Sequence, residues 1–157
     1  MALYPDQERV LGPDHPGMLA ARSNIAAWTG ECGDANEALR LFKALCPDQE
    51  RTLGPNHPDT LATRSNIAAW TGECGDANEA LRLFKALCPD QERVLGINHP
   101  DTLAARSSIA YWTGKYGNIH EALRLFKALL PDQKRVLGPD HPDTRITLGW
   151  IDNLSQR

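Results

Sequence analysis

The sequence predicts an all-α solenoid in which antiparallel helix pairs repeat along the chain and stack on one another. A Gly-x-x-His-Pro phrase recurs every 42 residues, with its glycine at Gly12, Gly54, Gly96 and Gly138. Apolar residues recur at helical spacing within each unit, and no run of alternating β-branched residues predicts a strand. An apolar face this broad cannot be buried within one helix pair, so we expect neighbouring units to cover it.

The repeat divides the chain into three whole units, 12–53, 54–95 and 96–137, between the partial units 1–11 and 138–157. The first and second whole units differ at only five positions, and the second and third differ at eleven. We interpret residues 1–157 as a single repeat domain. The first partial unit matches the end of a unit, which suggests a piece cut from a longer array. The last one has departed from the repeat, as a terminal cap would, at Arg145, Trp150 and Asp152.

Each unit is predicted to contain two helices, which we call helix A and helix B. In the second unit, His57 caps helix A, and proline follows at the first helical position, where its missing N–H is harmless. We expect helix A to run to about Thr71, with Gly72 and Gly75 on either side of a tight turn. A capping-box-like spacing then opens helix B, which is predicted over about 76–95.

A proline recurs inside the predicted helix B of every unit, at Pro47, Pro89 and Pro131. An interior proline removes a backbone hydrogen bond and destabilises a helix by about 3 kcal/mol or more. Two readings follow: a helix that continues with a kink or loosened turn, or two short helices with a break. The continuous helix is favoured because the helical spacing carries on beyond the proline.

Charge and hydropathy argue against several classes of partner. The formal net charge is −3, so the chain as a whole lacks the basic field of a nucleic-acid binder. No stretch approaches the roughly 18 apolar residues of a membrane span, and the polar N-terminus does not look like a secretory signal. We therefore predict a cytoplasmic protein with no nucleic acid, membrane or cofactor among its partners.

Three series of chemically capable residues follow the repeat period. The cysteines occupy two repeat positions, which favours ordinary partly buried thiols over a disulfide or a metal site. The histidines occur once per unit, so neighbours lie roughly 10 Å apart, too far to share a metal ion. The arginines could form a basic ladder for an acidic partner, or pair with acidic residues of a preceding helix B; pairing is favoured. The series are Cys32, Cys46, Cys74 and Cys88; His15, His57, His99 and His141; Arg22, Arg64 and Arg106.

No catalytic arrangement interrupts the periodic sequence. It contains no glycine-rich phosphate loop, no Ser/His/Asp or Cys/His set and no paired carboxylates outside the repeat. We predict no catalytic residue and no metal ligand, and therefore a protein that is not an enzyme.

The repeat resembles that of the tetratricopeptide repeat family. The resemblance lies in Asn66-Ile67-Ala68 of helix A, in Gly75 with Ala80 five residues later, and in Phe84. The 42-residue period resembles the long unit found in kinesin light chains and in bacterial signalling proteins. Arg64 stands where the family usually has a tryptophan, which occurs six residues later instead. The resemblance implies a right-handed superhelical solenoid whose helix A lines a concave groove.

By this resemblance the groove carries small and amide-bearing residues that leave room for a partner. An asparagine side chain pairs with both the N–H and the C=O of an extended backbone. Tyr111 is the one aromatic residue in the row and the expected anchor. The alternative is that small residues simply allow close helix packing. The candidate groove residues are Ser23, Asn24, Ser65, Asn66, Ser107, Ser108 and Tyr111.

Two functions fit this pattern. The first is a protein–protein interaction scaffold that binds a peptide or a partner domain in the groove. The alternative is a structural or sensor array of a larger bacterial signalling protein, with head-to-tail self-association and no ligand of its own. Near-identity of the units favours the alternative, because specific recognition tends to diversify groove residues.

Overall fold

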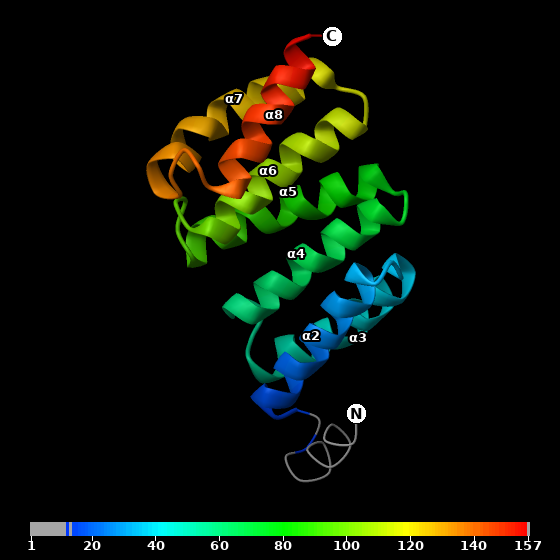
Figure 1. Cartoon of the computed structure of the whole chain (residues 1–157). Helices are drawn as coiled ribbons and strands as arrows, with labels where there is room; N and C mark the ends of the chain where they lie inside the picture. Colours follow the sequence, from blue (N-terminus) through cyan, green and yellow to red (C-terminus); the bar gives the residue numbers. More distant parts are fainter. Residues whose placement is uncertain (1–11, 13, 157) are drawn as a thin grey trace. The chain divides into compact units, whose positions relative to one another are not determined.

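A computed structural model describes Gly12 and residues 14–156, and it forms two compact bodies, Met1–Cys74 and Gly75–Arg157. Over the described residues the chain contains seven α-helices and no strand (Figure 1). The predicted all-α class is confirmed, and consecutive helices pack together within each body. The predicted partial unit 1–11 lies outside the described residues. The helices are α2 (Pro16–Glu31), α3 (Ala35–Thr52) and α4 (Pro58–Glu73), then α5 (Ala77–Val94), α6 (Pro100–Lys115), α7 (Ile119–Val136) and α8 (Pro142–Ser155).

The helices of type A are α2, α4, α6 and α8, and each begins with a histidine cap followed by proline. The ring Nδ1 of His57 accepts a hydrogen bond from the backbone N–H of Asp59 at 3.2 Å. His15 accepts in the same way from Gly17 at 3.1 Å. These bonds satisfy a backbone donor that the helix leaves unpaired. The predicted role of the histidines as N-terminal caps is confirmed.

The helices of type B are α3, α5 and α7, and each runs unbroken through its proline. The continuity favoured by the sequence is therefore confirmed, whereas the kink at the proline stays a prediction. The prediction for the turn before helix B was wrong at one glycine, because α4 extends through Gly72 to Glu73. Only Gly75 shapes this turn, with φ of 105°, a conformation that side chains with a Cβ rarely adopt.

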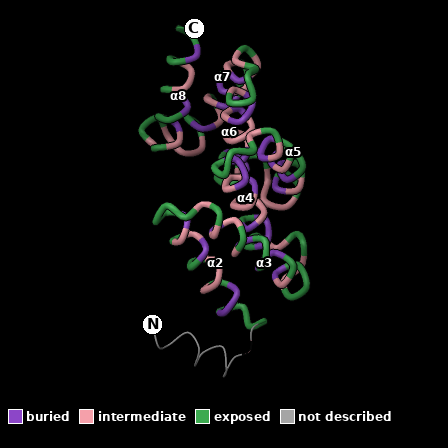
Figure 2. Tube along the Cα trace, turned by 90° about the vertical axis from the view of Figure 1, so that its right-hand side faces the viewer, coloured by how far each residue is buried: buried purple, intermediate pink, exposed green. Residues whose placement is uncertain are grey.

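One face of each helix B is buried in the core, together with apolar residues of the A helices. In α5 this face carries Ala80, Phe84, Leu87 and Gln91, spaced by three or four residues so that they share one stripe. The equivalent phenylalanines, Phe42, Phe84 and Phe126, are at most 1% exposed. Figure 2 shows buried residues on every helix of both bodies. Burial of such a side chain contributes about 1.5–3 kcal/mol, so each of these phenylalanines stabilises the fold substantially.

Ion pairs join helix A to helix B of the same hairpin. The Arg22 guanidinium donates to Asp48 Oδ2 at 2.8 Å, and Arg106 pairs with Asp132 at 2.9 Å. The pairing favoured by the sequence thus occurs, but with the helix B that follows the arginine and not with a preceding one. The reason is that α2 and α3, like α6 and α7, pack directly as hairpins.

Candidate functional site

A hollow between α2 and α4 brings together part of the predicted groove. We call it the α2–α4 hollow; its volume is about 160 Å³. Ser23 and Asn24 line it from α2, and the exposed Asp59 adds a carboxylate from the start of α4. Small side chains keep it open, because alanine occupies the positions that would otherwise fill it. Its residues are Ala20, Ser23, Asn24, Gln49, Asp59 and Ala62.

Gln49 gives this hollow a polar group that the sequence analysis missed. It lies on α3, is 1% exposed, and lines the hollow beside Ser23 and Asn24. Its Oε1 is buried and accepts no hydrogen bond from the described residues. Such an acceptor loses its hydration without compensation, which destabilises the fold by about 1–3 kcal/mol. A glutamine that recurs on an otherwise apolar helix face, at Gln91 and Gln133 as well, was the signal in the sequence.

The equivalent hollow of the second body lies between α6 and α8. This α6–α8 hollow has a volume of about 290 Å³ and contains Ser107, Ser108 and Tyr111 from the predicted groove. Trp150 of α8 lines it too, with its ring centroid 5.3 Å from that of Tyr111 in an edge-to-face arrangement. Asp143 occupies the repeat position of Asp59. The lining residues are Ala104, Ser107, Ser108, Tyr111, Asp143, Ile146 and Trp150.

Ser65 and Asn66, the remaining two predicted groove residues, lie half-buried on α4. They line neither the α2–α4 hollow nor the α6–α8 hollow. The predicted row is therefore gathered as two separate sets, Ser23 with Asn24 and Ser107 with Ser108 and Tyr111. A partner-binding role for all seven residues stays a prediction.

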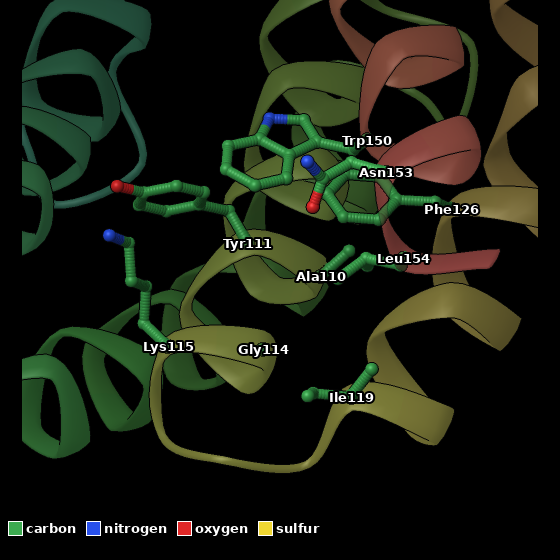
Figure 3. Close-up of a pocket in the computed structure, with 9 residues that line it drawn as sticks. All are labelled: Ala110, Tyr111, Gly114, Lys115, Ile119, Phe126, Trp150, Asn153 and Leu154. Carbon is green, nitrogen blue, oxygen red and sulfur yellow. The ribbon is translucent and has the colours of Figure 1, made fainter. Parts of the chain in front are cut away.

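A third hollow lies at the far end of α6, beside Gly114 (Figure 3). We call it the Gly114 hollow; its volume is about 170 Å³. Aromatic rings dominate it: Trp150 stacks on Phe126 with ring centroids 6.3 Å apart, and the Lys115 ammonium lies 5.5 Å from the Tyr111 ring centroid. The lining residues are Ala110, Tyr111, Gly114, Lys115, Ile119, Phe126, Trp150, Asn153 and Leu154.

A family model for the tetratricopeptide repeat matches residues 18–59, 60–101 and 102–143, three consecutive stretches that cover most of the chain. The chain belongs to the tetratricopeptide repeat family. The resemblance drawn from the helix A and helix B residues is thereby confirmed, and the chain is a repeat scaffold of the kind that generally mediates protein–protein interaction. No curated protein matches the sequence.

Solved tetratricopeptide-like structures share the fold. A Podosopora anserina protein of the kinesin light chain type, with nearly identical TPR-like repeats, is 25% identical over 98% of this chain and 73% of its own. Its TM-score is 0.77 for a variant form and 0.75 for a second crystal structure. BtubC (BKLC) from P. vanneervenii is 11% identical, with a TM-score of 0.77 over 88% of this chain and 56% of its own. The likeness to the Podosopora anserina structures supports the kinesin-light-chain-like type of tetratricopeptide repeat.

The cysteines of this tetratricopeptide repeat chain are free thiols in two environments. Cys32 and Cys74 are exposed, whereas Cys46 and Cys88 are buried. Burial, reinforced by the nearby Glu50 carboxylate, raises the pKa of the Cys46 thiol to about 11. The pKa of Cys88 is raised to about 11 in the same way, beside Glu92. At neutral pH the two buried thiols are therefore protonated and poorly nucleophilic.

Neither a metal-binding group of side chains nor a helix that could span a membrane occurs among the described residues. No group of three or more His, Cys, Asp or Glu side chains among them is arranged to hold a metal ion. No helix in the described part of the chain combines the length and apolarity needed to cross a membrane. The tetratricopeptide repeat is a non-catalytic type of scaffold, and its hollows offer hydrogen bonds, aromatic faces and carboxylates for binding.

Proposed function

We propose that this protein is an interaction scaffold that holds an extended peptide segment of a partner along its helix A surface. The observation that carries the proposal is Gln49, which lines the α2–α4 hollow and whose buried Oε1 has no hydrogen-bond donor among the described residues. A peptide N–H is the donor that an extended partner would supply. Asn24, exposed in the same hollow, can pair with a second backbone group.

Charge narrows the class of partner segment. The α2–α4 hollow contains the exposed Asp59, and Asp143 contributes a carboxylate to the α6–α8 hollow. The chain also has a net charge of −3. A segment with lysine or arginine side chains beside the bound backbone is therefore favoured, and this complementarity acts mainly on specificity and association rate.

The α6–α8 hollow supports the same function with a different anchor. Tyr111 and Trp150 present an aromatic pair there, and aromatic residues dominate the binding energy of many interfaces. The two hollows thus combine backbone pairing with aromatic contact. We propose the cytoplasm as the location, where reducing conditions keep thiols free.

The test uses a blocked decapeptide of alternating lysine and alanine as the probe. We expect its titration to shift the side-chain amide resonances of Asn24 and Gln49 in a nitrogen–proton correlation spectrum. A decapeptide of alternating glutamate and alanine is the matched control and should bind at least tenfold more weakly. The variant Gln49→Met keeps the side-chain volume and removes the acceptor, so it should weaken lysine-peptide binding by about tenfold, as the loss of a buried hydrogen bond predicts.

A second candidate function is a structural array with no peptide ligand. The near-identity of the first two repeat units favours it, because they differ at only five positions. If neither peptide shifts any resonance of the α2–α4 hollow, or if Gln49→Met binds like the wild type, the peptide scaffold is contradicted and the structural array is favoured.

A further inference from the structure

The repeat places an indole ring against a glycine 40 residues earlier in the chain. Within the first body, the Trp70 ring of α4 lies so close to the backbone of Gly30 in α2 that a Cβ at Gly30 would overlap it. The two residues are a matched pair in space: the glycine lacks a side chain, and the tryptophan ring takes that room. Gly30 is buried as a result.

The same glycine position at the end of the array receives no ring. Gly114 is the repeat equivalent of Gly30, but Leu154 stands at the repeat position of Trp70. A Cβ at Gly114 would meet only the Ala122 Cβ within 4 Å, at 3.2 Å. The shorter Leu154 side chain therefore leaves the Gly114 hollow of about 170 Å³, and Figure 3 draws the residues that line it.

One tryptophan of the repeat series is exposed at the other end of the chain. Trp28 of α2 occupies the repeat position of Trp70, yet 65% of its surface is exposed. Trp112, the third member of the series, is only 6% exposed. A tryptophan this exposed is uncommon, because burial of an aromatic side chain removes 150–250 Å² from water. In the described structure Trp28 is thus an exposed ring of the series, and Gly114 is a glycine with no ring against it.

We propose that the Gly114 hollow binds the Trp28 side chain of a second copy of this chain. The occupant is indicated by the molecule itself, since Trp70 already shows how this repeat seats an indole beside a glycine. An apolar cavity of roughly 150 Å³ takes a benzene ring, so the hollow of about 170 Å³ has room for the six-membered ring of an indole. Tyr111 and Trp150 supply ring edges and faces around the site.

This contact is heterologous, because the two partners use different surfaces. Trp28 belongs to the first body and the Gly114 hollow to the second, so every copy keeps one ring and one hollow available for the next copy. Association through such a contact continues into linear oligomers unless it closes into a ring. The inference does not depend on the proposed peptide scaffold, because it uses neither Gln49 nor Asn24.

Sedimentation velocity from about 10 to 500 μM tests the contact. We expect the wild-type mass to rise with concentration beyond that of a dimer. Trp28→Ala removes the ring, and Leu154→Trp fills the hollow from within the chain; each variant should stay monomeric. The double variant Trp150→Asn with Leu154→Trp restores the residues of the earlier units at both positions, in case the single substitution is too crowded. Thermal unfolding, monitored by circular dichroism, checks that each variant is folded.

Mixing the two single variants tests directly whether the Trp28 ring of one copy binds the Gly114 hollow of another. Trp28→Ala keeps the hollow and Leu154→Trp keeps the ring, so an equimolar mixture should form dimers that grow no further. Ile97→Ala removes another exposed apolar side chain, in the segment between α5 and α6, and should associate like the wild type.

Three results would overturn the proposal. The first is a wild-type protein that remains monomeric at 500 μM; the second is association that Trp28→Ala does not reduce at least tenfold; the third is a mixture that behaves as the sum of its parts. N-acetyl-tryptophanamide is the final probe. This probe should dissociate the wild-type oligomers. If the probe instead binds a wild-type protein that is strictly monomeric, the hollow takes an indole from another protein, and the proposal that Trp28 of a second copy occupies it is refuted.

Discussion

The indole ring of Trp70 lies directly over the backbone of Gly30, and this contact joins the two A helices of the first body. A glycine within a helix normally destabilises it by about 0.5–1 kcal/mol relative to alanine. Gly30 is nevertheless required, because its missing side chain is what allows the ring to pack. Gly114 shares the repeat position but not the contact, and this difference leads to the first prediction.

Gly30→Ala and Gly114→Ala are the same substitution at the same repeat position, but they should change the free energy of unfolding by different amounts. We expect Gly30→Ala to lower the free energy of unfolding by about 1–3 kcal/mol, because the new methyl group collides with Trp70. Gly114→Ala should change it by less than about 1 kcal/mol, since improved helix propensity offsets mild crowding with Ala122. Urea unfolding of both variants measures the difference, and equal losses would show that the ring contact is unimportant.

Gln133→Met should raise the stability of the chain. Gln133 is fully buried in α7, and neither its Oε1 nor its Nε2 has a hydrogen-bond partner among the described residues. Methionine has a similar volume without those polar atoms, so we expect a gain of about 1–3 kcal/mol in the free energy of unfolding. Lys134→Met, at an exposed neighbouring position, serves as the control and should stay within about 0.5 kcal/mol of the wild type. A loss of stability in Gln133→Met would mean that the glutamine is satisfied in solution.

Acid should weaken the helix hairpins through Asp48 and Asp132. A hydrogen bond from Arg22 holds the pKa of Asp48 below its ordinary value, and Arg106 does the same for Asp132. Because the folded pKa is the lower one, the stabilisation is fully present above the unfolded pKa of about 3.9 and disappears as the pH falls through the folded value.

The loss of stability between pH 5 and pH 2 should therefore be smaller in the variant Asp48→Asn/Asp132→Asn than in the wild type. At pH 7 the same variant should be less stable by about 0.2–1 kcal/mol per pair, as is usual for partly exposed pairs. Thermal unfolding at a series of pH values measures both effects. Parallel stability curves for the two proteins would contradict the assigned role of the ion pairs.

The four thiols should react in two classes. Cys32 and Cys74 are exposed, whereas Cys46 and Cys88 are buried with pKa values raised to about 11. Since the thiolate is the reactive form, a disulfide reagent at pH 8 should modify two thiols quickly and the other two only after unfolding in guanidinium. The variant Cys32→Ser/Cys74→Ser should lose the fast phase completely. Four thiols of equal reactivity would show that the helix B cysteines open readily to solvent.

Most of the secondary structure could be predicted from local patterns. The 42-residue period, the histidine and proline at the start of each helix A, and the Asp-to-Glu or Asn-to-Glu spacing at the start of each helix B predicted the existence and the start of all seven described helices. These signals act between residues a few positions apart, so the sequence displays them directly. The end of helix A was misplaced because a glycine is only mildly unfavourable inside a helix, and Gly72 lies within α4.

The contents of the candidate site were harder to predict. Ser23, Asn24 and Tyr111 do line hollows, but the contribution of Gln49 depends on how α3 packs beneath α2 and α4, and it was missed. Arg22 and Arg106 were expected to pair backward along the chain and pair forward instead, because hairpin packing places Asp48 beside Arg22 and Asp132 beside Arg106.

Repetition in the sequence settled the family, the helices and their caps, because each of these depends on contacts that recur in every unit. Packing between helices settled which polar atoms are buried without partners and where a glycine is covered by a ring. The second property depends on differences between units, such as leucine in place of tryptophan at position 154. Gly30 and Gly114 occupy equivalent positions in the repeat, and only the three-dimensional arrangement shows that one lies beneath Trp70 while the other borders a hollow.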